Sequence, residues 1–393
     1  MKNEAVIVSG ARTPVGKARK GLLVDTRPDD LGAITIKETL KRANNFDPAS
    51  IEDVIIGCAM PEAEQGMNMA RSMSMLAGLP YTVPSITVNR FCSSGLQSIA
   101  YGAERILSGQ AQAIIAGGAE SMSLVPMGGH VKVPNPVLVD EMPEYYMSMG
   151  HTAEEVAKKY HISREEQDRF AEESQRRATN AQRKHYFQEE IVPVEITTRT
   201  LTSDRKWREK KDVLMEDEGI RSDTTFEVLS RLKPVFHPRG TVTAGNSSQM
   251  SDGAASVLIM EKRRAYQEGL KPLIKFRSFA VAGVPPEIMG IGPIKAIPKA
   301  VKAAGLSMED IGLYEINEAF ASQALQVIRE LKIDHKKVNV NGGAIALGHP
   351  LGCTGTKLTL TLMYEMRRRK EQFGVVSMCV GGGMGAAGVF ELM

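Results

Sequence analysis

The chain has few cysteines, no long apolar run and almost no net charge, and each shortage excludes a class of protein. Lys and Arg (49) nearly balance Asp and Glu (46) over 393 residues, which gives no reason to expect binding to nucleic acid or to a charged membrane surface. Four scattered cysteines without CxxC spacing favour a reducing compartment and argue against a zinc site or a disulfide framework. They are Cys58, Cys92, Cys353 and Cys379.

The absence of a long apolar run also bears on location. The longest uncharged stretches, 72–89 and 338–356, are interrupted by Gly, Pro and polar residues, so neither predicts a transmembrane helix. The first residues lead directly into an apolar strand pattern, without a signal or transit segment. We therefore expect a soluble cytoplasmic protein with no membrane insertion, and a hydrophobic content of 42% that supports more than one domain.

Strand and helix patterns alternate in the first third of the chain. Apolar runs predict strands at 5–8, 54–56 and 113–116, and a short buried strand at 84–88. Helical spacing of apolar residues predicts helices at 29–41 and 68–76, and a third directly after Cys92. Such alternation predicts an α/β fold around a buried sheet.

The middle of the chain differs in character. Residues 123–150 are rich in Met, Pro and Gly, which predicts a long irregular covering segment. Capping boxes at Thr152-x-x-Glu155 and Ser163-x-x-Glu166 predict the starts of two helices. The stretch 197–223 is polar and carries both charge signs, without an evident role.

The last third repeats the order of the first. A predicted strand at 338–341 leads through a small-residue loop into a helix at 355–368, then a strand at 375–380 and a glycine run. This indicates one half-fold used twice. The expected domains are an N-terminal half (1–122 with 249–270), an inserted loop domain (123–248) and a C-terminal half (271–393).

Cys92 lies where a predicted strand turns into a helix, followed by Ser93, Ser94 and Gly95. The free N–H groups and dipole of a helix start favour negative charge, and such a position lowers a thiol pKa. We therefore expect a Cys92 thiolate near neutral pH. The alternative is an ordinary buried cysteine.

Three more stretches carry chemistry. His349 lies in an almost uncharged, Gly-rich loop and is a candidate general base for a cysteine nucleophile. Cys379 precedes the glycine run and is a candidate acid/base, while the Asn317 amide is suited to holding an oxyanion or a water. A structural histidine and a core thiol are the alternatives. The match of residues 383–388 to the dinucleotide motif GxGxxG is rejected, because the chain ends before the helix and strand that the motif requires.

Together these stretches resemble the thiolase family. The resemblance rests on Val-Asn-Arg-Phe-Cys-Ser-Ser-Gly at 88–95, Asn-Glu-Ala-Phe at 317–320, Gly-Gly-Ala at 342–344, Gly-His-Pro at 348–350 and Cys-Val-Gly-Gly-Gly-Met-Gly at 379–385. It runs through the whole chain in order. It implies two duplicated five-stranded βαβ half-folds in a layered αβαβα arrangement, with a loop domain over the active site.

The resemblance also implies roles. Cys92 is the nucleophile that carries an acyl thioester, His349 activates it, and Cys379 exchanges a proton with the α-carbon. Backbone N–H groups of Cys92 and Gly381 form one oxyanion hole, and His349 with a water on Asn317 forms the other. Coenzyme A enters as a substrate, with no permanently bound cofactor and no metal.

The residues that match the family's coenzyme A contacts lie mostly in the loop segment. Arg221 is expected near the adenine and phosphates, unless it is a solvated charge, and Ala244 and Ser248 along the pantetheine. The apolar lining matches Met149, Phe236, Ala319 and Phe320, which could equally be plain core.

Ser148 decides between two branches of the family. The acetoacetyl-CoA branch, which condenses two acetyl-CoA, usually has His at this position, so this chain resembles the degradative 3-ketoacyl-CoA thiolases of fatty acid β-oxidation. The smaller side chain leads us to expect broad chain-length acceptance. A ketoacyl synthase would pair its cysteine with two histidines, and a pure acyl-CoA binder would be expected to lack one of Cys92, His349 and Cys379. A homodimer is the minimum assembly that the resemblance implies, with a tetramer left open.

Overall fold

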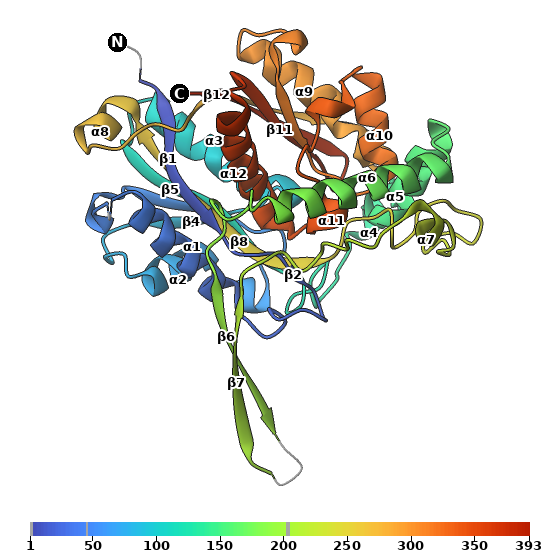
Figure 1. The fold of residues 1–393 in the computed structure, drawn as a ribbon, viewed down its shortest axis with the longest axis horizontal. Coiled ribbons are helices and arrows are strands. Elements are labelled where there is room, and N and C mark those ends of the chain that lie inside the picture. The colour runs from blue at the N-terminus through green and yellow to red at the C-terminus, as the bar shows by residue number, and fades with distance from the viewer. Residues whose placement is uncertain (1–2, 45, 202–204) are drawn as a thin grey trace.

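A computed structural model describes residues 3–44, 46–201 and 205–393. Its main sheet has the strand order β10-β11-β12-β9-β1-β8-β5-β3-β4, with β2 (Gly16–Lys17) paired to β8. Figure 1 shows the sheet running through the molecule. The strands are β1 (Ala5–Arg12), β3 (Asp53–Gly57), β4 (Ser85–Val88), β5 (Ala113–Ser121), β8 (Ser251–Glu261), β9 (Ile274–Gly283), β10 (Leu313–Ile316), β11 (Phe373–Val380) and β12 (Met384–Leu392).

The two halves of this sheet have the same pairing pattern. In the first half, β1, β8 and β5 pair antiparallel, and β5, β3 and β4 pair parallel. In the second, β9, β12 and β11 pair antiparallel, and β11 and β10 pair parallel. The place of a fifth strand is held by one parallel bridge between Val338 and Tyr314. The expected strand at 338–341 is therefore reduced to a single bridge, while the duplication itself is present.

Helices cover both outer faces and fill the middle. Helices α1 and α2 share a core with one face of the first half-sheet, and α9 and α10 with the far face of the second. Between the half-sheets, α3 and α12 share a core with both. This is the predicted αβαβα order. The helices are α1 (Pro28–Arg42), α2 (Met69–Ala77), α3 (Ser94–Leu107), α8 (Lys262–Gln267), α9 (Gly292–Ala303), α10 (Ala321–Glu330), α11 (Ala344–Leu347) and α12 (Leu351–Arg369).

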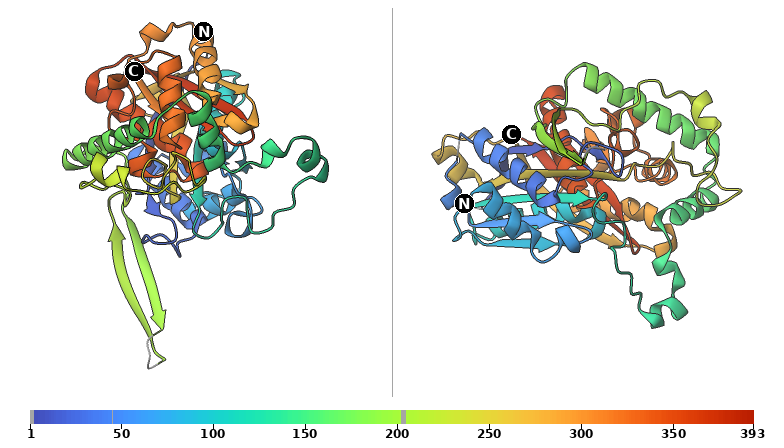
Figure 2. Two further views of the ribbon diagram at one scale, coloured as in Figure 1. Left: turned by 90° about the vertical axis from the view of Figure 1, so that its right-hand side faces the viewer. Right: turned by 90° about the horizontal axis from the view of Figure 1, so that it is seen from below.

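The segment between β5 and β8 wraps around this core. It contains α4 (Pro136–Glu141), α5 (Met149–Lys159), α6 (Arg164–Arg183), α7 (Phe226–Ser230) and a hairpin of β6 (Val194–Leu201) and β7 (Trp207–Leu214). The hairpin projects far from the body of the molecule, and the stretch around α4 forms a second projection (Figures 1 and 2). The hairpin occupies much of the polar stretch 197–223, of which residues 202–204 lie outside the described residues.

Short 3-10 turns connect several elements. One of them, η3, contains Cys92 of the candidate site described below, and η5 precedes α9. The turns are η1 (Pro48–Ser50), η2 (Ala63–Gln65), η3 (Phe91–Ser93), η4 (Pro143–Tyr146), η5 (Pro286–Ile291), η6 (Met308–Asp310) and η7 (His335–Lys337).

Two further local predictions are wrong. The strand expected to be buried at 84–88 is the sheet's edge strand β4, and Ile86 is 49% exposed because β4 pairs on one side only. Thr152 does not cap a helix, because α5 already begins at Met149, whose carbonyl accepts the Thr152 hydroxyl at 2.7 Å. The capping box at Ser163 and Glu166 is confirmed.

The rejected GxGxxG match falls on β12, a strand, rather than on a loop that opens a helix. Within the described parts of the chain, no helix combines the length and apolar character needed to cross a membrane.

Candidate active site

Three of the predicted site residues lie at the carboxyl ends of parallel strands. Cys92 follows β4, Asn317 directly follows β10, and Cys379 is the second-to-last residue of β11, before the glycine run. The pairs β3–β4 and β10–β11 run parallel, so side chains at their carboxyl ends gather at one edge in each half. Ligand sites of α/β sheets are found at such edges.

A strained turn presents Cys92. Phe91 adopts a positive φ of 43°, a conformation that costs a bulky residue about 1–3 kcal/mol. Two side chains hold it: Asn89 Oδ1 accepts the Phe91 N–H at 2.7 Å, and the Ser94 hydroxyl donates to the Phe91 carbonyl at 2.6 Å. The turn η3 then places Cys92 two residues before the first residue of α3, Ser94.

The Cys92 thiol is not the thiolate expected from its helix start. Burial raises its pKa to about 11, and the carboxylate of Glu120 acts in the same direction. The backbone N–H groups of Gly381 and of Cys92 itself act on the sulfur in the opposite sense, but desolvation outweighs them. The expectation of a lowered pKa is therefore wrong for the free protein. The two N–H groups remain the pair expected to form an oxyanion hole.

His349 is buried in the loop between α11 and α12, with partners on both ring nitrogens. Nδ1 lies 2.6 Å from Thr354 Oγ1, and Nε2 lies 3.2 Å from Asn317 Nδ2. The backbone N–H of His349 donates to Ser251 Oγ and to the Gln249 carbonyl, both at 3.1 Å. Burial, with a smaller effect of the Lys357 charge, lowers the pKa of His349 to about 3. The imidazole is therefore neutral in the free protein and has a lone pair on one ring nitrogen, although so low a pKa makes it a weak base there.

Glycines bring the Cys92 turn and the His349 loop together. A Cβ on Gly95 of α3 would lie 2.6 Å from the Gly352 carbonyl oxygen, and a Cβ on Gly355 of α12 would lie 2.3 Å from the Leu96 nitrogen. Thr356 Oγ1 donates to the Gly95 carbonyl at 3.1 Å. The two helix starts thus touch backbone to backbone, which no larger residue at these positions would permit.

A buried carboxylate, Glu120, accepts hydrogen bonds from backbone near both of these loops. Glu120 lies at the carboxyl end of β5 and is fully buried. Burial raises its pKa, while hydrogen bonds from four N–H donors favour its charged form. It joins the turn after β3 to the start of α12. Its donors are the backbone N–H groups of Ala59 (2.8 Å), Met60 (3.2 Å) and Gly352 (2.7 Å) and the Gln65 side-chain amide (2.7 Å).

Cys379 lies close to the first cysteine, from the other half. It is 1% exposed, and its pKa is raised well above the ordinary value by burial and then by the neighbouring Cys92. The next residue but one, Gly381, faces Met149, whose sulfur would lie 3.7 Å from a Cβ at that position. A neutral thiol at this place is a proton donor.

An apolar cluster adjoins Cys379. Met149, Phe236, Ala319 and Phe320 belong to it together with Cys379, so the four predicted lining residues come from distant parts of the chain to one place. The rings of Phe236 and Phe320 meet edge to face at 6.2 Å. The cluster is suited to an apolar part of a ligand.

The three other residues predicted to contact coenzyme A, Arg221 near the nucleotide and Ala244 and Ser248 along the pantetheine, are placed differently. Ser248 is near the cluster, since its N–H donates to the Ala319 carbonyl at 2.9 Å. Arg221 and Ala244 are exposed, and the Arg221 backbone N–H donates to Gln175 Oε1 at 2.8 Å. The exposed Ser148 hydroxyl is bonded to His151 Nδ1 at 2.6 Å.

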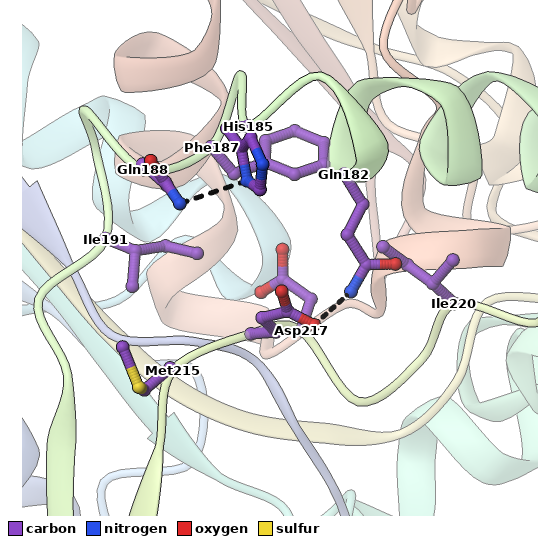
Figure 3. A pocket seen from close by; sticks show the side chains of 9 residues that line it. Gln182, His185, Phe187, Gln188, Ile191, Met215, Asp217 and Ile220 are labelled. Carbon is purple, nitrogen blue, oxygen red and sulfur yellow. Dashed lines mark hydrogen bonds between the residues drawn. The ribbon is translucent and has the colours of Figure 1, made fainter.

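Figure 3 shows a pocket of a different kind. Asp217 and Phe187 lie on its wall, and none of the predicted site residues lines it. Asp217 and Glu190 hold the fully buried Arg12 guanidinium, at 2.7 and 2.8 Å. These ion pairs connect Glu190 and Asp217 of the loop segment to Arg12 of β1. The pocket beside them therefore adjoins a structural contact between the loop segment and the sheet.

Comparison with family models decides the family. The model of the thiolase N-terminal domain matches residues 5–263, and that of the thiolase C-terminal domain matches residues 270–392. The chain belongs to the thiolase family.

Curated relatives and solved structures extend this result. The chain is 68% identical to the 3-ketoacyl-CoA thiolase of Bacillus subtilis, covering 99% of both chains, and 46% identical to peroxisomal 3-ketoacyl-CoA thiolase 1 of Arabidopsis thaliana, covering 99% of this chain and 88% of the relative. Human mitochondrial 3-ketoacyl-CoA thiolase and the Bacillus anthracis acetyl-CoA acetyltransferase each superpose with a TM-score of 0.89 at 39% identity, covering 100% of this chain and 99% of theirs.

Within this thiolase fold, sequence reasoning missed several supporting residues. Glu120 and Thr354 contact the loops that carry Cys92 and His349, and Gly355 permits the close helix contact. The sequence offers one signal for Thr354: it follows His349 by five residues and lies in the first turn of a helix. It offers none for Glu120, whose partner Gly352 lies 232 positions away.

Proposed function

We propose that this chain cleaves a 3-ketoacyl-CoA with coenzyme A, giving acetyl-CoA and a shortened acyl-CoA. The observation that carries the proposal is that Cys92, Cys379, Asn317 and His349, from four separate stretches, meet beside an apolar cluster. The names of the curated relatives support the degradative substrate. The roles below are those expected from the sequence, applied to the geometry.

In the first half-reaction, Cys92 becomes acylated. Its S–H proton passes to His349 Nε2 as the sulfur bonds to the 3-keto carbon. The bond between carbons 2 and 3 then breaks, its electron pair leaves on acetyl-CoA as an enolate, and the enolate carbon takes the Cys379 S–H proton. The raised pKa values of both thiols keep both protons in place until a substrate arrives.

In the second half-reaction, a new coenzyme A takes the acyl group. Its thiol gives a proton to the Cys379 thiolate and attacks the thioester carbonyl. The Cys92 sulfur leaves and recovers its proton from the His349 imidazolium. Both cysteines end as thiols, so atoms and charges balance over the cycle without a redox partner.

Two places stabilise the charges that develop on oxygen. The N–H groups of Cys92 and Gly381, which already act on the Cys92 sulfur, serve one oxyanion. Once His349 has taken the Cys92 proton, its Nε2–H and a water held by Asn317 serve the other; the Asn317 side chain is fully buried, and its Oδ1 has no hydrogen-bond partner among the described residues. One good donor is worth about 3–4 kcal/mol of barrier.

Coenzyme A would approach along the loop segment. We place the acyl-thioester end against Met149, Phe236 and Phe320, the pantetheine along Ser248 and Ala244, and the nucleotide beside the exposed Arg221. Coenzyme A is a substrate here, and no permanent cofactor is proposed. We also propose a cytoplasmic homodimer as the smallest assembly; sedimentation at micromolar concentration tests it, and a monomer would contradict it.

A thiolysis assay tests the function. Loss of 3-ketoacyl-CoA in the presence of coenzyme A is followed for acyl chains of increasing length, with Cys92→Ala as the control. We expect turnover of long substrates, because Ser148 is small and exposed, and no turnover in the variant. Activity confined to acetoacetyl-CoA would support the condensing branch instead, and tight binding without turnover would support a pure acyl-CoA binder.

A further inference from the structure

The His349 ring has a fixed partner on each nitrogen, and these partners decide which nitrogen carries the proton. Thr354 Oγ1 lies 2.6 Å from Nδ1, and Asn317 Nδ2 lies 3.2 Å from Nε2. All three side chains are buried, with exposures of 1% for Thr354, 0% for Asn317 and 5% for His349. The ring therefore lies among buried hydrogen-bond donors and acceptors.

The Thr354 hydroxyl has a single proton to give. Its oxygen lies 2.8 Å from the Pro350 carbonyl oxygen, one helical turn earlier. If the proton pointed to His349 instead, two oxygens would face each other at that distance with no hydrogen between them. With the proton on the Pro350 side, Thr354 Oγ1 can only accept, and it accepts from Nδ1–H.

We propose that Thr354 is a positioning residue that holds neutral His349 in the Nδ1–H tautomer and leaves the lone pair on Nε2. The inference deepens the proposed function, on which the role of His349 rests. In this tautomer Nε2 accepts the Asn317 N–H in the resting site and takes the Cys92 proton when the sulfur attacks. The resulting imidazolium keeps its Nδ1–H bond to Thr354 throughout.

Asn317 supports the same assignment. Its Nδ2 is a donor and so requires a lone pair on Nε2. The opposite tautomer would require the amide to turn so that Oδ1, which has no partner among the described residues, accepts from Nε2–H. The position of the ring proton and the orientation of the Asn317 amide thus both depend on the Thr354 hydroxyl. Without this hydroxyl, the ring can take either tautomer and the amide either orientation.

Nuclear magnetic resonance of protein labelled with ¹⁵N at histidine tests the tautomer directly. The His349 signals among the seven histidines are identified by their loss in His349→Gln. We expect a protonated Nδ1 and an unprotonated Nε2 in the wild type and in Thr354→Ser. In Thr354→Val, which keeps the shape and loses the hydroxyl, we expect a mixture or the reverse tautomer. A protonated Nε2 in the wild type, or an unchanged tautomer in Thr354→Val, would overturn the proposal.

A neighbour in the same helix supplies the matched control. Thr359 is fully buried and donates to the Gly355 carbonyl at 2.8 Å, again one turn earlier, without touching His349. Thr359→Val therefore removes the same kind of bond, and we expect it to leave the tautomer unchanged. If Thr354→Val melts well below Thr359→Val, the wild-type and Thr354→Ser spectra still decide the question.

Kinetics give the second readout. We expect Thr354→Val to lower kcat about tenfold to hundredfold at nearly constant KM, less than the about 10²–10⁴-fold of losing an acid/base group because His349 itself is kept, and Thr354→Ser to recover most of it. Equal kcat in Thr354→Val and wild type would count against the proposal. If the wild type itself cleaved no 3-ketoacyl-CoA, the proposed function would fail, while the tautomer measurement would still test Thr354.

Discussion

The two halves of the molecule use one architecture for different tasks. At the carboxyl end of β5 in the first half stands Glu120, a buried carboxylate that holds loops together. At the carboxyl end of β11, which has the same place in the second half, stands Cys379, a buried thiol beside Cys92. The starts of the two central helices carry Cys92 and His349. Duplication therefore supplied equivalent positions, and the side chains divide them between chemistry and support.

The first prediction concerns the two cysteines and has the largest expected effect. Cys92→Ala should lower thiolysis by at least about 10⁴-fold, because no acyl group can be carried. Cys379→Ala should lower it by about 10²–10⁴-fold, the range of acid/base catalysis. Acyl label trapped in denaturant should appear on the Cys379→Ala protein and be absent from Cys92→Ala. Label on both variants would mean that the halves do not divide the roles in this way.

The second prediction concerns Glu120. Replacing it by Gln places an amide N–H₂ among four N–H donors, so the free energy of unfolding should fall by about 3 kcal/mol. Urea denaturation measures this. Glu104→Gln, at an exposed glutamate on α3, should stay within about 0.5 kcal/mol of the wild type. An equal decrease in the free energy of unfolding in the two variants would contradict the supporting role that we assign to Glu120 at the end of β5.

The third prediction tests the contact between the two central helices. Gly355→Ala pushes a Cβ to 2.3 Å from the Leu96 nitrogen, which should cost about 1–3 kcal/mol of stability and reduce kcat about a hundredfold by moving His349 relative to Cys92. Thermal unfolding and the thiolysis assay report the two effects. Gly283→Ala is the control, since the nearest atom to its Cβ lies at 4.0 Å. Normal kcat in Gly355→Ala would show that the spacing is set elsewhere.

The fourth prediction separates a thiol from a thiolate. With the Cys92 pKa raised to about 11, the thiolate fraction grows with pH throughout the range below it. Alkylation of Cys92 by iodoacetamide in the free protein should therefore accelerate about tenfold for each pH unit between 7 and 10. Peptide mass spectrometry follows the modification, with Cys92→Ala as the blank. An alkylation rate that is already constant above about pH 7 would instead support the thiolate expected from the position of Cys92 at a helix start.

Much of this site was predictable because its residues carry local signals. Cys92, His349 and Cys379 each adjoin small residues or glycine runs, and each lies at a predicted junction between elements. The structure brings them into one region with Asn317 and Gly381, although their roles remain predictions for the variants above to test. The layered fold and its duplication were likewise visible, since strand and helix patterns recur in the same order.

Two of the failures share a cause, which is that long-range order decides them. The burial of 84–88 was misjudged because only the strand order makes β4 an edge. The Cys92 pKa was misjudged because the helix start is local, whereas the burial that outweighs it comes from the packed halves. The third failure is local: Ser148 and Thr152 are both residue types that cap helices, and the structure has Ser148 at the N-cap, so that α5 begins at Met149.

The junction between the halves has a consequence for how the chain emerges from the ribosome. Strands β1 and β9 share only two residue pairs, Val6 with Lys275 and Ile7 with Ile274, whereas α12 shares a core with both half-sheets. The first half is fully synthesised at Glu261, yet α12 begins at Leu351. At ordinary translation rates roughly 5–20 seconds separate the two. For that interval the nascent first half exposes the apolar face that α12 will cover, which makes it a natural client for a chaperone.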